Sequence, residues 1–176
     1  MSSRRVVTGH DADGNSVFVS DEDFAPVTLS MMPGSEFRRL WSSDSAHDYP
    51  GAGVDPQASS YFPPIGGFRF TTVTFPPAGD AAEYPDDMEA AAAEVEEKLP
   101  GIMAHMEFDD PGMHTSNTTD FNVLLSGELI LELDNGAEVL LKPGDTIVQN
   151  ATRHRWRNPG TAPAVVASVI VGAEPR

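Results

Sequence analysis

The sequence predicts an all-β domain, a sandwich or barrel, with one α-helix. From Thr119 onward, turn signals at SGE, DNGAE, KPGD and NPGTAP recur every ~8–12 residues and separate short runs of β-forming residues. A helical pattern is found only at residues 85–99. The length of 176 residues suits a single domain with a full core.

The N-terminal part is predicted to form a β-hairpin followed by a long loop. The alternating runs RRVVTGH and SVFVSDEDF flank DADGN, whose Asp-Gly pair is a strong hairpin-turn signal. Residues 42–67 are rich in Ser, Pro, Gly and Asp, and they form either a lid or an ordered surface connection. We therefore assign residues 1–66 to an arm and loop of the same unit, and residues 67–176 to the barrel.

The middle of the chain is predicted to contain a strand and then the helix. The run FRFTTVTF alternates in the manner of a strand and stops at two prolines. Residues 85–99 have acidic residues in the first turn, alanines in the middle, and KLPG at the end. Met88, Ala92, Val95 and Leu99 recur at helical spacing, which predicts an amphipathic helix packed on a sheet.

Composition and charge exclude several classes of function. The net charge of −16 repels nucleic-acid phosphates and anionic lipid surfaces. The chain has no cysteine, so a metal would have to be bound by His, Asp or Glu. It contains neither a signal-peptide-like apolar run nor a run of ~18 apolar residues. The expectation is a soluble, cytoplasmic protein that binds neither nucleic acid nor membrane.

Two stretches contain candidate site residues. In GMHTSNTTDF, His114 and Asp120 can share a metal ion only if the chain reverses within SNTT, because on a straight strand they would lie ~20 Å apart. In TRHRWRN, strict alternation places His154, Trp156 and Asn158 on one face and three arginines on the other. Trp156 marks the inner face, whereas the arginine row suits a solvated face that pairs with carboxylates.

At these residues the chain resembles the cupin superfamily, small β-barrels in which two short motifs supply metal ligands. KPGD with Gly144, then His154 and Asn158, matches the second motif, and Asp120 followed by Gly127 matches the end of the first. The resemblance implies a double-stranded β-helix, or jelly-roll barrel, with an N-terminal β extension and one α-helix. The N-terminal region also resembles small single-domain cupins of microbial secondary metabolism, some described as oxidoreductases of polyketide pathways.

The sequence departs from the cupin pattern in its metal motif. Cupin metal sites usually open with H-x-H, but Ser116 stands two residues after His114, and the carboxylate is Asp120 rather than Glu. The resemblance carries over His114, Asp120 and His154 as ligands of a divalent Fe, Mn, Zn or Ni ion. Two imidazoles and a carboxylate suit such ions. His105 or Glu107 is a candidate to replace the missing second histidine.

Three functional hypotheses follow. The first is a metal-dependent enzyme that oxidises, decarboxylates, dehydrates or isomerises an aromatic or polyketide-like molecule. The second is a metal-free protein in which the catalytic histidines, His114 and His154, act as acid and base or bind a ligand. The third is a non-catalytic binding module. In each, the pocket is expected to include Ser116, Trp156, Phe68 and Phe70, and the resemblance implies a homodimer.

Overall fold

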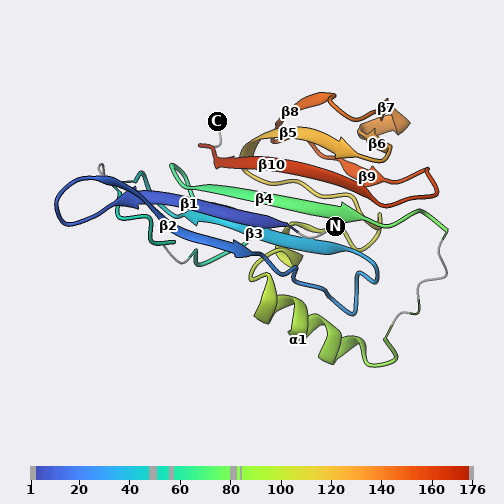
Figure 1. The fold of residues 1–176 in the computed structure, drawn as a ribbon. Helices are drawn as coiled ribbons and strands as arrows, with labels where there is room; N and C mark the ends of the chain where they lie inside the picture. Colours follow the sequence, from blue (N-terminus) through green and yellow to red (C-terminus); the bar gives the residue numbers. More distant parts are fainter. Residues whose placement is uncertain (1–2, 48–50, 56–57, 80–82, 84, 175–176) are drawn as a thin grey trace.

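The computed structural model describes residues 3–47, 51–55, 58–79, 83 and 85–174, and it is dominated by antiparallel β-strands (Figure 1). Its helical elements are α1 (Met88–Lys98) and the 3₁₀ turns η1 (Met103–His105) and η2 (Asp134–Gly136). The strands are β1 (Arg4–His10), β2 (Ser16–Asp23), β3 (Glu36–Ser43), β4 (Phe68–Phe75), β5 (Thr118–Ser126), β6 (Leu129–Glu132), β7 (Glu138–Leu141), β8 (Thr146–Asn150), β9 (Arg155–Arg157) and β10 (Ala164–Gly172).

Three sheets organise these strands. The largest has the order β3-β4-β10-β5-β8, a second has the order β7-β6-β9, and β1 pairs with β2 alone. In Figure 1 the strands of the largest sheet run side by side, and β6, β7 and β9 lie at one end of the sheet. The predicted all-β architecture with one α-helix is confirmed.

The predicted N-terminal hairpin is present and packs against β3. In its turn, the Asp11 carboxylate accepts hydrogen bonds from the backbone N–H groups of Asp13 (3.0 Å) and Asn15 (2.8 Å). The Arg5 guanidinium donates to the Leu40 carbonyl over 3.0 Å and lies near the Trp41 ring. Within the 42–67 segment, residues 48–50 and 56–57 lie outside the described part of the chain.

Strand β3 is an element that the sequence pattern did not indicate. It pairs antiparallel with β4 and so adds residues from the first third of the chain to the main sheet. Its buried Arg38 forms an ion pair with Glu36 (2.8 Å) and donates to the Phe24 carbonyl. Two adjacent arginines obscure the apolar alternation of this strand in the sequence.

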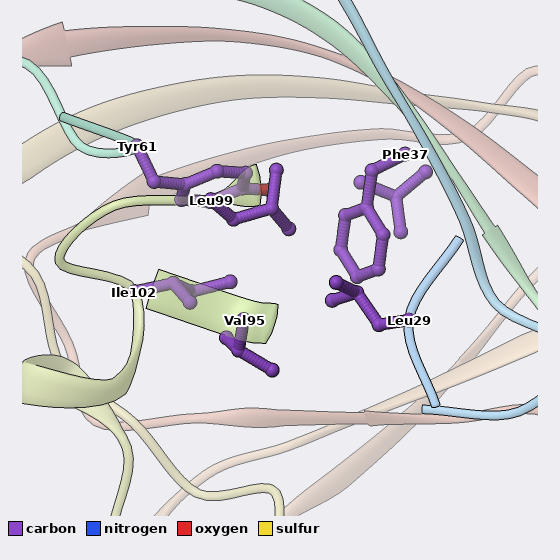
Figure 2. Packing of buried hydrophobic residues seen from close by; sticks show 7 residues of the cluster. Leu29, Phe37, Tyr61, Val95, Leu99 and Ile102 are labelled. Carbon is purple, nitrogen blue, oxygen red and sulfur yellow. The ribbon is translucent and has the colours of Figure 1, made fainter. Parts of the chain in front are cut away.

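The predicted helix is present and closes one side of the sheet. Asp87 caps it by accepting a hydrogen bond from the Ala90 N–H (2.9 Å). Val95 and Leu99 are fully buried, but Met88 is 49% exposed. Figure 2 shows the labelled side chains of this region gathered in one cluster, whose buried members are Leu29, Phe37, Tyr61, Val73, Val95, Leu99 and Ile102.

A second core fills the space between the two larger sheets, and Gly127 permits its tight corner. Gly127 has φ of 77°, and a Cβ there would lie 2.6 Å from Ala164 Cα, so the motif glycine is required. The buried residues of this core are Leu124, Leu129, Leu131, Leu141, Ala164 and Val166.

In the part of the chain that is described, no helix is long and apolar enough to cross a membrane.

The outer face of the main sheet has an exposed apolar row. Phe70, Val169, Phe121 and Val148 are cross-strand neighbours on four successive strands, and each is exposed. Alternation also places only uncharged residues at the other outward positions of β4, β10, β5 and β8. Two copies of a chain with net charge −16 repel each other, and the repulsion is weakest where uncharged faces meet.

We propose that this uncharged outer face pairs with the same face of a second copy. Light scattering at tens of micromolar should therefore give the mass of a homodimer. Phe121→Glu, which introduces a charge into the row, should shift the protein to monomer without unfolding it. Val139→Glu, at an exposed position of the smaller sheet, is the matched control and should remain dimeric. A monomeric wild-type protein would contradict the proposal.

Candidate functional site

A cavity of about 1140 Å³ lies between α1, the inner face of the main sheet and strand β9. Its wall is mainly apolar and includes Phe37, Phe62, Phe75 and Trp156. Five of the seven methionines of the chain also line it: Met31, Met32, Met88, Met103 and Met106. Methionine side chains adapt to irregular apolar ligands. Such a wall suits a sizeable hydrophobic molecule.

His114 and His154 are paired by the backbone and lie ring against ring in this cavity. Each residue donates its backbone N–H to the carbonyl of the other, over 3.0 Å in both directions. The ring centroids are 4.2 Å apart. The structure therefore places these two predicted site residues side by side, and both line the cavity.

Hydrogen bonds define the tautomer of both rings. His114 Nδ1 lies 3.1 Å from the Gly112 carbonyl, and His154 Nδ1 lies 2.9 Å from the Thr152 carbonyl. A carbonyl can only accept, so Nδ1 carries the proton in each ring. In the neutral imidazole, Nε2 then retains a lone pair for a proton, a ligand or a metal.

Burial keeps both imidazoles neutral. It lowers the pKa of His154 to about 4, with a smaller contribution from the neighbouring His114. Burial also lowers the pKa of His114, and a hydrogen bond to the Gly112 carbonyl partly offsets the effect. At neutral pH the pair therefore presents two unprotonated Nε2 atoms in a mainly apolar cavity.

Asp120 lines the same cavity but is not part of the histidine pair. A metal ion shared by His114 and Asp120 required a chain reversal within SNTT, and the chain does not reverse there. The segment bends at Asn117 and continues along the same neighbour, since the Ala151 N–H bonds the Thr118 carbonyl and Asp120 lies opposite Gln149. The pairing of remote backbone segments outweighs the local turn preference of Ser, Asn and Thr.

The Asp120 carboxyl group is buried and incompletely hydrogen-bonded. Its Oδ1 atom is inaccessible and has no hydrogen-bond partner among the described residues. Burial raises its pKa to about 6, although a hydrogen bond with the Thr118 side chain acts in the opposite direction. A buried polar atom without a partner is costly, and such atoms often mark sites of function.

Three residues predicted to line the pocket do not do so. Ser116 is buried, and its hydroxyl lies 2.7 Å from the Thr118 hydroxyl. Phe68 and Phe70 lie on the opposite face of β4 from the cavity-lining Thr71, Val73 and Phe75, and Phe70 is exposed. The prediction for these phenylalanines is wrong because the inner face of β4 begins with the buried Arg69.

Buried Arg69 explains why the hydrophobic residues of β4 misled the sequence interpretation. Its guanidinium donates to the carbonyls of Ser43 (2.7 Å) and Ser60 (3.0 Å), and to the Asp44 carboxylate (2.6 Å). A charge that is paired and hydrogen-bonded in this way tolerates burial. The phenylalanines on the other side of the strand are left on the outer face.

Strand β9 positions its side chains as the alternation predicted. Trp156 lines the cavity and packs edge-on against the His154 ring, with the ring centroids 5.9 Å apart. The Asn158 side chain donates to the carbonyls of Phe75 (3.0 Å) and Ala162 (2.8 Å), and accepts from the Gly160 N–H (2.9 Å). Asn158 therefore holds the loop after β9 in place.

The arginine row pairs with carboxylates, as predicted. The Arg153 guanidinium donates to both carboxylate oxygens of Glu107, over 2.8 and 2.7 Å. The Arg155 guanidinium donates to both carboxylate oxygens of Glu132, over 2.8 and 2.6 Å. Arg157 bonds Glu132 and Glu138. Because both Glu107 oxygens are bound by Arg153, this carboxylate is not available to replace the missing second histidine as a metal ligand.

The donor set fits a divalent metal only in part. The two free Nε2 atoms have the orientation of metal-bound histidines, whose Nδ1–H is usually held by a carbonyl or carboxylate. However, no three His, Asp or Glu side chains in the described portion of the chain lie close enough together to hold an ion. The set His114, Asp120 and His154 is thus not assembled, and His105 Nδ1 is bound to the Thr115 carbonyl over 2.8 Å.

Comparison with known proteins gives a family match over part of the chain. Residues 105–170 match the family model described as Cupin domain. The matched stretch contains His114, His154 and Asp120. The resemblance of this part of the chain to the cupin superfamily is therefore confirmed.

Some of the curated relatives are named as biosynthesis cluster proteins and others as cupin-domain-containing oxidoreductases. The chain is 48% identical over 50 residues to Oryzines biosynthesis cluster protein J of Aspergillus oryzae, covering 28% of each chain. It is 33% identical over 66 residues to Cupin-domain-containing oxidoreductase virC of Hypocrea virens, covering 36% of this chain and 34% of the relative. A match to Cupin-domain-containing oxidoreductase srdB of Neurospora crassa has 26% identity and covers 88% and 65% of the two chains. The first of these matches thus spans about a quarter of the relative's length.

Among solved structures, the chain is similar to a putative ethanolamine utilization protein q from Salmonella typhimurium. The TM-score is 0.48 and the identity 11%, with 99% of each chain covered. A Cupin 2 conserved barrel domain protein from Salinispora arenicola matches with a TM-score of 0.46 and 14% identity, covering 88% and 92% of the chains.

The sequence interpretation missed several cavity residues. Tyr61, Asn122 and Ser168 all line the cavity and are buried. Asn122 and Ser168 occupy the same alternating faces as Asp120 and Ile170, so strand periodicity contains the signal once the inner face is known. Tyr61 lies in the long loop, where no periodicity exists.

Replacing Asp120 by Asn should stabilise the protein at high pH. A carboxyl group whose pKa is raised to about 6 contributes stability below its unfolded pKa of about 4, and this is lost as the pH rises through 6. Asp120→Asn should therefore gain roughly 3 kcal/mol at most in free energy of unfolding above this range, and nothing at acidic pH. Denaturant unfolding below about pH 4 and above about pH 6 measures this difference in free energy of unfolding. Asp109→Asn, at an exposed position, is the control, and an equal gain at both pH values would contradict the assignment.

Proposed function

We propose that this protein is an enzyme that transfers protons on an aromatic or polyketide-like small molecule, with His114 and His154 as the catalytic pair. One observation carries the proposal: two neutral imidazoles in contact, both with a free Nε2, in a large apolar cavity. Such a base can remove a proton from a carbon next to a carbonyl and return it elsewhere. The reaction class is enolisation, with isomerisation or dehydration as its outcome.

The environment of the pair supports proton transfer. Because burial favours the neutral rings, each Nε2 is unprotonated at neutral pH. The Gly112 and Thr152 carbonyls, which accept from Nδ1, orient the rings and stabilise the imidazolium that forms. The apolar wall excludes water from the reacting carbon and favours a hydrophobic substrate.

The names of the relatives support this substrate class. Oryzines biosynthesis cluster protein J is named as a biosynthesis cluster protein, and the proteins virC and srdB are named as cupin-domain-containing oxidoreductases. We take from these names the proposal that this chain acts on a secondary metabolite.

Metal dependence is the second candidate, and the orientation of the two histidines favours it. A divalent ion would be bound by Nε2 of His114 and of His154, and it would supply Lewis-acid or redox chemistry. The described residues do not provide a third donor at this position. We therefore derive no catalytic step that depends on such an ion.

Hydrogen–deuterium exchange in heavy water tests the proposed proton transfer directly. The protein should catalyse deuterium uptake next to the carbonyl of hydrophobic aryl alkyl ketones, as followed by mass spectrometry. His114→Ala and His154→Ala should each slow the exchange by about 100-fold or more. His10→Ala, in the N-terminal hairpin, is the matched control and should retain the wild-type rate.

The same assay separates the two candidates when chelator is added and bound metal is measured. Full activity at less than about 0.1 equivalent of metal supports proton transfer by the histidines alone. Stoichiometric metal, lost together with activity in both histidine variants, favours the metal-dependent candidate. Equal rates in wild type and both variants would contradict a catalytic role for the pair.

A further inference from the structure

Three polar side chains on the inner face of the main sheet have polar atoms without hydrogen-bond partners among the described residues, in an otherwise apolar region. Asp120, Asn122 and Ser168 are each more than nine-tenths buried and line the cavity. The side chains of Asn122 and Ser168 form no hydrogen bond to any residue that the structure describes. Oδ1 of Asp120 is likewise unpartnered within the described ranges. Burying polar groups in this way costs free energy unless a ligand or water satisfies them.

The register of β5 and β10 brings these groups together. Asn122 and Ser168 are direct cross-strand partners, which places their Cβ atoms about 5 Å apart. Asp120 is two residues along the same face of β5, at roughly 7 Å. The three side chains therefore form a polar patch wide enough to contact two oxygen atoms of one ligand.

The charge of the cavity wall selects against anions. Arg157 is the only Arg or Lys among the described lining residues, and it is paired with Glu132 and Glu138. Glu83, Glu107 and Asp120 line the same cavity. A ligand carboxylate near the polar patch would meet no free cation, whereas neutral hydroxyl and carbonyl groups can exchange hydrogen bonds with an amide and a hydroxyl.

We propose that Asn122, Ser168 and Asp120 form the specificity-determining patch of the cavity and bind a neutral hydroxyl-carbonyl unit of a hydrophobic substrate. The Asn122 amide N–H donates to the ligand carbonyl, and the Ser168 hydroxyl and the Asp120 carboxyl exchange hydrogen bonds with the ligand hydroxyl. This inference rests on the proposed function and names its substrate class: β-hydroxyketones on an aromatic or other apolar body, in preference to carboxylic acids.

Binding of three matched probes tests the inference, and Trp156 in the cavity wall provides a fluorescence signal. The probes are a naphthyl β-hydroxyketone, the alkylnaphthalene of equal length and a naphthyl alkanoic acid. The wild-type protein should bind the hydroxyketone about 10-fold more tightly than the alkylnaphthalene, and the acid most weakly. Asn122→Leu and Ser168→Ala should each weaken hydroxyketone binding by about 10-fold but leave alkylnaphthalene binding unchanged or stronger.

Asn150→Leu, on the outer side of the same sheet, is the control and should change none of the three affinities. Equal wild-type affinities for the hydroxyketone and the alkylnaphthalene would overturn the inference, as would variants that lose both probes alike. The binding assay requires no turnover. Probe selectivity without deuterium exchange would therefore reject the proposed function alone, and exchange without selectivity would reject the polar patch alone.

Discussion

The arrangement of the site depends on one interaction, the reciprocal backbone pairing of His114 with His154. Two hydrogen bonds of 3.0 Å join the segment before β5 to the start of β9. Since a hydrogen-bonded antiparallel pair projects both side chains to the same side, the rings meet at 4.2 Å. The Gly112 and Thr152 carbonyls, each two residues before its histidine, then hold Nδ1 and leave Nε2 free. This backbone pairing and the two carbonyls thus determine where the rings lie, which tautomer they adopt and that they are in contact.

The cavity around the pair is maintained by structure on all sides. Helix α1 closes one side through Val95 and Leu99, and the core around Leu124 and Leu129 fills the far end of the barrel. Outside β9, the ion pairs of Arg153, Arg155 and Arg157 hold the strand against the acidic segments around it, including η2. The interior can therefore hold unpartnered polar groups without collapsing. Such groups cost stability in the free protein and are compensated when a ligand binds them.

Much of the fold could be predicted from the sequence, because turn residues and strand alternation are local signals. The hairpin at DADGN, the helix and the inward face of His154 and Trp156 all follow from such patterns. The inner face of β4 could not be predicted, because a buried Arg69 with carbonyl and carboxylate partners reverses the expected polarity. The course of the chain through SNTT could not be predicted for a related reason. Ser, Asn and Thr favour a turn locally, but the remote partner segment decides the course of the chain.

The most direct test of the histidine pair is a two-bond proton–nitrogen correlation spectrum of the imidazoles at neutral pH, with His114→Gln and His154→Gln used to assign the signals. Both rings should be neutral, with the proton on Nδ1 and an unprotonated Nε2, and a bound hydroxyketone should shift the Nε2 resonances. A proton on Nε2 of either ring, or an imidazolium signal from either histidine, would contradict the proposed role of the pair.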